Sequence, residues 1–485
     1  MYPTLYEINT RVWLNKFGKG TSLSDVPSSY WENLKQRGVD YVWLMGVWAT
    51  TASSIAKHCF HPDLVMAYNQ VTTDWVESDI KGSPYAIEDY VLADDLGGKE
   101  DLRSLKERLN QLGLKLILDF IPNHFNADSE LLESNADVFL QVSEEDFKAD
   151  PYTYFRHGDK FFAHGKDPYF PAWSDTVQVN YNSPAAHKFM KNRLLQVAEY
   201  CDGVRCDMAM LILPDVFQNT WASTTSPGQP DFWTEAINEV KSKDPDFIFI
   251  AEAYWDTEWR LHLMGFNYTY DKKLLDFIVR DQINNLKSHL AGSLEYHNQT
   301  VRFIENHDEE RSLTSLGESK ARAAAILYNT LPGMRLHYDG QWSGERIRYP
   351  VQVGTYFQPD LCICAIKNDL DTAETPCACM AAFYHRLLMV CSSEVFKYGD
   401  WKLIDTYPYP NECIVVEWTH DNTCVLVTVN MGFSPNEITI PLPDPWRKEV
   451  IRDLLNEEPS PNYVTVVENN INLRLPGFKG CILSN

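Results

Sequence analysis

Long hydrophobic runs are missing from this sequence of 485 residues. No segment approaches the roughly 20 consecutive apolar residues that a membrane-spanning helix needs, so we expect no membrane partner. The opening residues, MYPTLYEINTRVWL, also lack the basic leader, apolar segment and small-residue cleavage site of a secretory signal. They are typical of a first strand, and we expect a cytoplasmic protein.

Positive charge is scarce. Lys and Arg together number 43 against 67 Asp and Glu, which gives a formal net charge of −24. A chain with so little basic surface cannot neutralise many phosphates, so we expect no nucleic-acid partner. The charge balance fits a neutral substrate, and no feature of the sequence specifies an oligomeric state.

The cysteines lack the spacing of a disulfide scaffold or of a zinc site. There are 11, an odd number, scattered along the chain. Two close pairs, Cys362 with Cys364 and Cys377 with Cys379, have C-x-C spacing rather than the C-x₂-C spacing of zinc ligands. We therefore expect reduced thiols, as in other intracellular proteins.

Strand-like and helix-like segments alternate over the first three quarters of the chain. For example, the amphipathic segment LRSLKERLNQLG ends at Gly113 and is followed at once by the apolar run LKLILDF. About eight such units fit between Leu5 and Tyr398, which predicts a parallel sheet covered by helices. Polar residues follow strands over the whole length, which favours a closed (β/α)8 TIM barrel. No G-x-G-x-x-G follows the first strand, which disfavours a nicotinamide-dependent oxidoreductase.

Two parts of the chain depart from this alternation. About sixty residues separate His124 from the next predicted helix near Pro184, against the usual two to six. We predict an inserted domain over 125–181, with the catalytic barrel over 1–124 and 182–397. Beyond residue 397, short β-rich runs alternate with turns, which predicts a C-terminal antiparallel β-sandwich over 398–485.

Four of the predicted strands end in polar side chains. The sequences at these ends are DFIPNH (119–124), GVRCD (203–207), AEA (251–253) and FIENHD (303–308). In a β/α barrel the carboxyl ends of the strands form the reaction face, so these groups are expected at one mouth. Asp207, Glu252 and Asp308 would then each come from a different strand.

Converging carboxyl groups suit the cleavage of a glycosidic bond with retention, which needs one nucleophilic carboxylate and one proton donor. Arg205 precedes Asp207 by two residues and shares its strand face, so its charge would keep Asp207 ionised. Glu252 lies between two alanines after an apolar run, a setting that would keep it protonated. An acid at a strand end is, taken alone, more often a helix N-cap or a surface charge than a catalytic group. The order of the three acids along the chain favours a site.

These four stretches resemble, in the same order, the diagnostic regions of the α-amylase family of glycoside hydrolases (family 13). The resemblance covers nearly the whole chain. It implies a retaining enzyme that acts on the α-glucosidic bonds of α-glucans or malto-oligosaccharides. It also implies that Asp207 is the nucleophile, Glu252 the acid/base catalyst and Asp308 the stabiliser of the transition state, with Arg205 orienting the nucleophile.

The same resemblance assigns residues around the sugar. It implies that Tyr85 stacks on the sugar at the cleavage point and that His124 and His307 bind its hydroxyl groups. Asp119 and Asn123 would support the site structurally. No cofactor is required for the implied reaction.

The resemblance leaves two questions open. Asn123 matches a position that binds calcium in many relatives, and Asp175 could assist in holding that ion. Met210 and Leu211 stand where many α-amylases have a Lys-His pair that contacts the leaving-group sugar. An apolar pair cannot make those polar contacts. The alternatives are therefore a 4-α-glucanotransferase or other transglycosylase, an exo-glucosidase, or an isomerising member of the family. A non-catalytic carbohydrate-binding or assembly protein is less favoured, because all three carboxyl groups are present.

Overall fold

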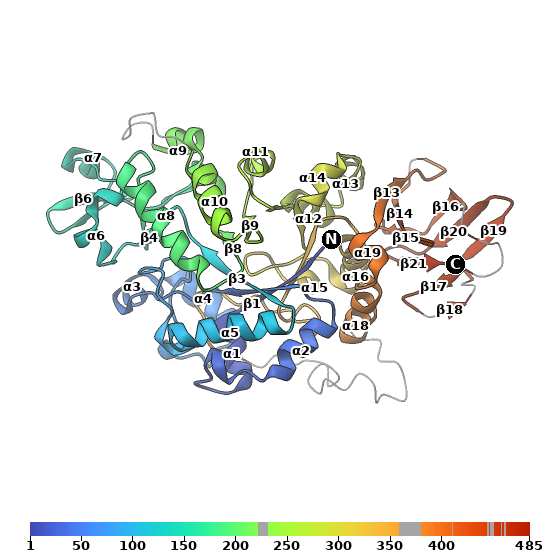
Figure 1. Ribbon diagram of the computed structural model, residues 1–485, viewed down its shortest axis with the longest axis horizontal. Helices are drawn as coiled ribbons and strands as arrows, with labels where there is room; N and C mark the ends of the chain where they lie inside the picture. Colours follow the sequence, from blue (N-terminus) through green and yellow to red (C-terminus); the bar gives the residue numbers. More distant parts are fainter. Residues whose placement is uncertain are drawn as a thin grey trace.

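The computed structural model of the chain describes residues 1–221, 231–357, 380–409, 411–443, 446, 451–456, 458–459 and 462–485. At its centre lies a closed barrel of parallel strands in the order β1-β12-β11-β10-β9-β8-β3-β2 (Figure 1). The predicted TIM barrel is confirmed. The barrel strands are β1 (Thr4–Asn9), β2 (Tyr41–Met45), β3 (Lys115–Phe120), β8 (Gly203–Cys206), β9 (Ile248–Ala251), β10 (Tyr268–Tyr270), β11 (Thr300–Arg302) and β12 (Met334–Tyr338).

Helices surround this barrel, and their apolar faces join its strands in one large core. In α5, the buried Leu102, Leu105 and Leu109 recur at helical spacing, as the sequence pattern predicts. The longer helices are α2 (Ser28–Gln36), α4 (Pro62–Val71), α5 (Lys99–Gln111), α8 (Pro184–Ala198), α9 (Pro214–Trp221), α10 (Phe232–Lys243), α12 (Lys272–Val279), α13 (Ile283–Leu290), α16 (Gly317–Asn329) and α18 (Met380–Cys391). The shorter ones are α1 (Thr10–Leu14), α3 (Ala52–His58), α11 (Glu258–Leu263), α14 (Leu294–Asn298), α15 (Ser312–Ser315) and α19 (Glu394–Tyr398).

The register of three neighbouring strands places the polar stretches side by side. Asp119 on β3 pairs with Arg205 on β8, which in turn pairs with Ile250 on β9. Beyond the strand ends, the N–H of Asp207 donates to the carbonyl of Phe120. The N–H of Glu252 donates to the carbonyl of Cys206. Parallel pairing therefore brings the predicted carboxyl groups to one rim of the barrel.

The long connection after β3 forms small sheets and two short helices at one end of the molecule (Figure 1). Strand β4 begins at His124, so this histidine already belongs to the first strand of the inserted region. The strands pair β4 with β7 and β5 with β6, both antiparallel. The elements are β4 (His124–Asn126), α6 (Leu131–Ser134), α7 (Glu144–Ala149), β5 (Tyr154–His157), β6 (Lys160–Ala163) and β7 (Thr176–Gln178).

The C-terminal part folds as antiparallel sheets at the opposite end of the longest axis (Figure 1). A six-stranded sheet (β13-β14-β15-β21-β17-β18) and a three-stranded sheet (β16-β20-β19) share an apolar core that includes Val415, Ile438 and Leu473. The predicted C-terminal antiparallel domain is thus confirmed. Its strands are β13 (Asp400–Ile404), β14 (Cys413–His420), β15 (Thr423–Asn430), β16 (Asn436–Pro441), β17 (Arg452–Asp453), β18 (Glu458–Pro459), β19 (Val464–Val467), β20 (Asn470–Leu475) and β21 (Gly480–Ser484).

Among the described residues, every helix is too short or too polar to cross a bilayer. The described cysteines, seven in number, are free and buried. One of them, Cys206, lies next to Asp207, and burial raises the pKa of its thiol well above the ordinary value. The two C-x-C pairs at 362–364 and 377–379 lie outside the described residues.

Candidate active site

Arg205 lies at the centre of the candidate site and is fully buried. Its Nη1 donates to Oδ1 of Asp207 at 2.9 Å, and its Nη2 donates to Oε2 of Glu252 at 2.7 Å. One planar guanidinium therefore holds both carboxyl groups. The sequence pattern foresaw the contact with Asp207 but not the one with Glu252, because only the barrel register brings β9 beside β8.

Further groups fix the guanidinium in place. Its Nε donates to the hydroxyl of Tyr270 at 3.2 Å, and Nη1 lies 3.5 Å from Oδ1 of Asp119. The rings of Trp43, Tyr85 and Tyr270 surround the cation, with centroids 5.1, 5.4 and 5.6 Å from its carbon. A cation enclosed by aromatic faces and carboxylates stays charged and keeps one orientation.

The surroundings of Glu252 differ from the predicted apolar setting. The carboxyl is buried, but it accepts hydrogen bonds from Arg205, from the N–H of Met208 at 2.8 Å and from the hydroxyl of Tyr254 at 2.8 Å. Burial nevertheless outweighs the Arg205 charge and raises the pKa of Glu252 to about 7. Burial thus favours the protonated form, as expected, but three hydrogen-bond donors surround the carboxyl where the sequence suggested only apolar neighbours.

Asp207 was expected to be strongly ionised by Arg205, and here too the structure corrects the argument. Burial raises the pKa of Asp207 to about 6, and the opposing charge of Arg205 offsets only part of that effect. The neighbouring Asp119 and Asp308 raise it further. Burial therefore raises the pKa of both Asp207 and Glu252, whereas the sequence argument expected it to act on Glu252 alone.

Asp308 follows β11 and stands beside His307. The Nε2 of His307 lies 3.0 Å from Oδ2 of Asp308, while its Nδ1 lies 2.5 Å from Oε1 of the fully buried Glu7 on β1. Burial alone would lower the pKa of His307, but the two carboxylates raise it to about 10. In turn, the His307 charge overcomes partial burial and lowers the pKa of Asp308 to about 2. The carboxylate of Asp308 is about half exposed, at 47%, toward the mouth.

Tyr85 and His124 lie on the same rim. The hydroxyl of Tyr85 lies 2.8 Å from Nε2 of His307, and the two rings are stacked with centroids 5.4 Å apart. Nε2 of His124 lies 3.0 Å from the carbonyl of Tyr85, and its Nδ1 lies 3.3 Å from the amide of Asn123. Burial lowers the pKa of His124 to about 4, so the ring is neutral. Both of its nitrogens have protein partners, so a sugar hydroxyl would have to share one of them.

Asp119 occupies the position expected of a structural support. Its Oδ2 accepts from the indole N–H of Trp43 at 3.2 Å and from the N–H of Gly46 at 3.3 Å. Burial raises the pKa of Asp119 to about 6, against the opposing charge of Arg205. These contacts connect β2, β3 and β8 beneath the mouth.

The surroundings of Asn123 do not fit the calcium ion that the resemblance suggests. Its side-chain oxygen and its carbonyl each accept from Nε2 of Gln178 at 2.9 Å, and the same Nε2 lies 3.0 Å from the carbonyl of Val179. A buried NH₂ group thus lies among the oxygens that a cation would need. The side-chain oxygen of Gln178 is itself buried without a hydrogen-bond partner among the described residues. Among the described residues, moreover, no group of three acidic, histidine or cysteine side chains converges as a metal site. Asp175 contributes its backbone carbonyl to the N–H of Ala127.

Several residues of the site escaped the sequence analysis, namely Glu7, Trp43, Tyr254 and Tyr270. Glu7 had a usable signal, because a charged residue in the apolar run TLYEIN of a buried barrel strand needs a partner. The aromatic residues had none, since they resemble ordinary core residues. Met210 and Leu211 are buried in the short 3₁₀ turn Ala209–Ile212 rather than exposed in the mouth.

Comparison with known proteins identifies a family for the chain. The family model described as the α-amylase catalytic domain matches residues 30–346. The α-amylase MalA of Haloarcula japonica is 26% identical over 356 residues, which are 71% of this chain and 44% of that protein. α-Amylase 3 of Dictyoglomus thermophilum is 24% identical over 284 residues, 54% of this chain and 53% of its own. The chain thus spans about half or less of the length of these curated relatives.

Solved structures of similar proteins have the same fold. A noncanonic maltogenic α-amylase of Thermotoga neapolitana superposes with a TM-score of 0.70 at 19% identity, over 99% of this chain and 98% of its own. A debranching enzyme of Nostoc punctiforme also gives 0.70, at 14% identity, over 100% and 98% of the two chains. At these identities the structures establish the fold, and the family model establishes the ancestry. The chain therefore belongs to the α-amylase family of glycoside hydrolases.

Proposed function

We propose that the protein cleaves α-glucosidic bonds of malto-oligosaccharides and longer α-glucans with retention of configuration. The observation that carries this proposal is the shared guanidinium of Arg205, which bonds Asp207 and Glu252 at once. This favours the short carboxyl separation of retaining enzymes, about 5–5.5 Å, over the gap of about 6.5–9.5 Å that inverting enzymes need for a water molecule.

In the first step the carboxylate of Asp207 attacks the anomeric carbon while the carboxylic acid of Glu252 gives its proton to the departing oxygen. The glycosidic bond breaks and an ester forms between the sugar and Asp207. In the second step the Glu252 carboxylate takes a proton from water, whose oxygen attacks the anomeric carbon, and the ester bond to Asp207 breaks. The product leaves, and both carboxyl groups return to their starting protonation states.

The neighbouring residues would support these steps. The carboxylate of Asp308 lies beside the mouth and would stabilise the positive charge that develops on the sugar ring. Its ionised state is maintained by His307. Nε2 of His307 already lies beside Asp308 and the Tyr85 hydroxyl, so a sugar hydroxyl would have to share or displace one of these contacts. Tyr85 would stack beneath the ring, and His124 would contact a hydroxyl by sharing Nε2 with its carbonyl partner. No step needs a cofactor.

A second candidate function is transfer of the glycosyl group to another sugar. Two aromatic residues that would bind this acceptor sugar favour it. Tyr169, from the inserted region, and Trp255, three residues after Glu252, contact each other edge to face with centroids 4.9 Å apart. They are 68% and 37% exposed. Aromatic faces bind a sugar by stacking, and they displace water from the rim. Similar proteins include cyclomaltodextrin glucanotransferases.

Chromatography of the products from maltose, maltoheptaose, trehalose, sucrose and starch tests both candidates. We expect shorter malto-oligosaccharides from maltoheptaose, and products longer than the donor would show transfer. Asp207→Asn should abolish turnover of every substrate. Glu252→Gln should lose about 10²- to 10⁴-fold on maltoheptaose, but much less on an aryl glucoside whose leaving group needs no proton.

Asp215→Asn is the matched control, because this carboxyl is exposed on α9 and pairs with Arg260. It should retain wild-type activity. Full activity of Asp207→Asn would refute the proposed chemistry. Binding of glucan without turnover by the wild-type protein would instead favour a non-catalytic binding protein.

A further inference from the structure

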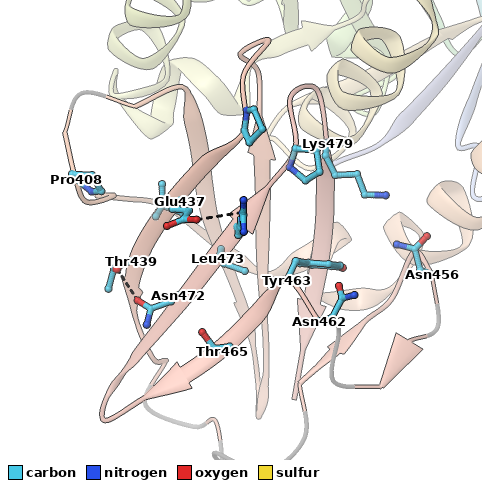
Figure 2. A pocket seen from close by; sticks show the side chains of 14 residues that line it. Pro408, Glu437, Thr439, Asn456, Asn462, Tyr463, Thr465, Asn472, Leu473 and Lys479 are labelled. Carbon is cyan, nitrogen blue, oxygen red and sulfur yellow. Dashed lines mark hydrogen bonds and ion pairs between the residues drawn. The ribbon is translucent and has the colours of Figure 1, made fainter.

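A groove of about 1120 Å³ lies on the C-terminal domain, and its lining residues all fall between Pro408 and Lys479 (Figure 2). It covers the outer face of the three-stranded sheet β16-β20-β19. Strand alternation directs Ile438 and Leu473 into the core between the sheets, so the alternate residues Thr439 and Asn472 face the groove. The groove is thus separate from the mouth of the barrel.

A row of polar side chains crosses the floor of this groove. Thr439, Asn472 and Thr465 lie opposite one another on the three strands. The hydroxyl of Thr439 donates to Oδ1 of Asn472 at 2.7 Å (Figure 2). Because this bond uses the amide oxygen, the NH₂ group of Asn472 is left as a donor toward a ligand.

A buried carboxylate holds two side chains that line the groove. Asp453 is fully buried and accepts a hydrogen bond from the hydroxyl of Tyr463 at 2.6 Å and another from the side-chain amide of Asn456. An ordinary polar sheet surface is simply solvated and needs no such support. Side chains fixed in advance lose less freedom when a ligand binds, so this arrangement favours binding.

The chemistry of the lining residues indicates a neutral ligand. Glu437 and Arg474 face each other across β16 and β20 with their charges paired at 3.3 Å. An aromatic ring, several amides and two hydroxyls remain, as provided by Tyr463, Asn472 and Thr465, and Lys479 adds one positive charge to the lining. A sugar ring matches this set, because it offers hydroxyls to the amides and an apolar face to the aromatic ring.

We propose that this groove is a second carbohydrate-binding site, which holds part of an α-glucan chain while another part occupies the barrel. The proposal rests on the proposed function for the identity of the sugar. Two sites on one polymer raise its effective local concentration, so the groove would matter for long chains more than for short ones.

Electrophoresis of the full chain through gels containing amylopectin tests this proposal. Every variant carries Asp207→Asn so that the polymer stays intact. Asn472→Ala and Tyr463→Ala should each weaken retardation about tenfold, the equivalent of roughly 1.4 kcal/mol. Asn470→Ala is the matched control, because it is exposed on the same strand and outside the groove. Thermal unfolding by circular dichroism checks that each variant folds.

Retardation of Asn472→Ala equal to that of its Asp207→Asn parent would overturn the second site. Tyr463→Ala removes the hydrogen bond to Asp453 and could fail to fold for that reason. In that case Asn472→Ala alone still tests the proposal. The turnover assay on maltoheptaose separates the two proposals. A wild-type protein that cleaves maltoheptaose, with groove variants that bind amylopectin normally, would refute only the groove. A protein that cleaves no glucoside would refute the proposed function, while the gel still measures binding.

Discussion

Arg205 links the two carboxyl groups that must play opposite roles. Because its guanidinium bonds both Asp207 and Glu252, it cannot by itself make one ionised and the other protonated. Burial raises the pKa of both, to about 6 and about 7. The division of roles therefore depends on which of the two neighbouring carboxyl groups keeps the proton, and the two titrate as a coupled pair.

The raised pKa values of the two groups predict a bell-shaped pH profile. As pH falls through about 6, Asp207 takes up a proton and loses its nucleophilicity, so kcat/KM should fall on the acid side. As pH rises through about 7, Glu252 loses the proton that the leaving oxygen needs, so kcat/KM should fall again. Initial rates on maltoheptaose between pH 4 and pH 9 measure this. A flat profile across that range would contradict the assignment of the pair.

The contact between Glu7 and His307 should matter for catalysis. Glu7→Gln removes the buried charge under the imidazole, so the pKa of His307 should fall and Asp308 should lose part of its support. We expect a decrease in kcat/KM of roughly tenfold or more, since a hydrogen bond to a charged group contributes about 1.5–3 kcal/mol. A new pH dependence on the alkaline side should accompany it.

Glu309→Gln is the control for Glu7, because it removes a carboxylate that pairs with Lys272 near the same rim but outside the His307 contacts. Its profile should match the wild type. If Glu7→Gln lowers only thermal stability and leaves the pH profile unchanged, Glu7 is merely structural.

Among the secondary-structure elements, the sequence predicted best those in which buried residues form a continuous run or recur at helical spacing. The apolar run LKLILDF and the helix before it were predicted and observed as β3 and α5. GVRCD was expected at the end of a strand, whereas Gly203–Cys206 is itself the strand β8, with Arg205 inside it. A buried arginine in a strand is stable only because two neighbouring strands supply its partners, and no local pattern reveals that. The three-residue strands β10 and β11 are likewise defined by pairing rather than by hydrophobicity.

The hydrogen bonds between the inserted region and the barrel predict that the stability of this junction does not depend on a metal ion. Gln178 on β7 donates to Asn123, the residue just before the facing strand β4, so EDTA should leave the melting temperature unchanged. Gln178→Ala should lower the free energy of unfolding by about 1–3 kcal/mol, because it leaves buried oxygens without a donor. Urea unfolding followed by fluorescence, with and without EDTA, measures both effects.

Gln141→Ala provides the comparison for Gln178, because its exposed side chain donates to only one carbonyl, that of Ala136, in the same region. This control should lose little stability. A large decrease in melting temperature with EDTA, restored by calcium, would show that an ion holds the junction after all.

For the whole molecule, the change from βα alternation to short β runs located the C-terminal domain correctly. It did not reveal how this domain joins the barrel. Trp418 on β14 is fully buried, contacts Tyr2 edge to face at 5.3 Å and donates its indole N–H to the carbonyl of Thr330 at 2.8 Å. Such contacts join residues from both ends of the chain, and local sequence carries no sign of them.

This shared interface predicts that barrel and C-terminal domain unfold together. Trp418→Ala should lower the free energy of unfolding by about 3–5 kcal/mol, the usual cost of removing a buried tryptophan. Tryptophan fluorescence and loss of activity should still follow one transition in urea. Phe433→Ala, at an 84% exposed position of the same domain, should change little. Two separate transitions for the wild type would refute a cooperative interface.

Trapping the glycosyl-enzyme intermediate tests the central claim most directly. A 5-fluoro-α-glucosyl fluoride supplies a good leaving group, and its ring fluorine slows the second step, so the ester should accumulate. Mass spectrometry of proteolytic fragments should then find one added fluoroglucosyl group, attached to the peptide that contains Asp207. Turnover of substrate with no adduct, or an adduct on a peptide without Asp207, would contradict the account.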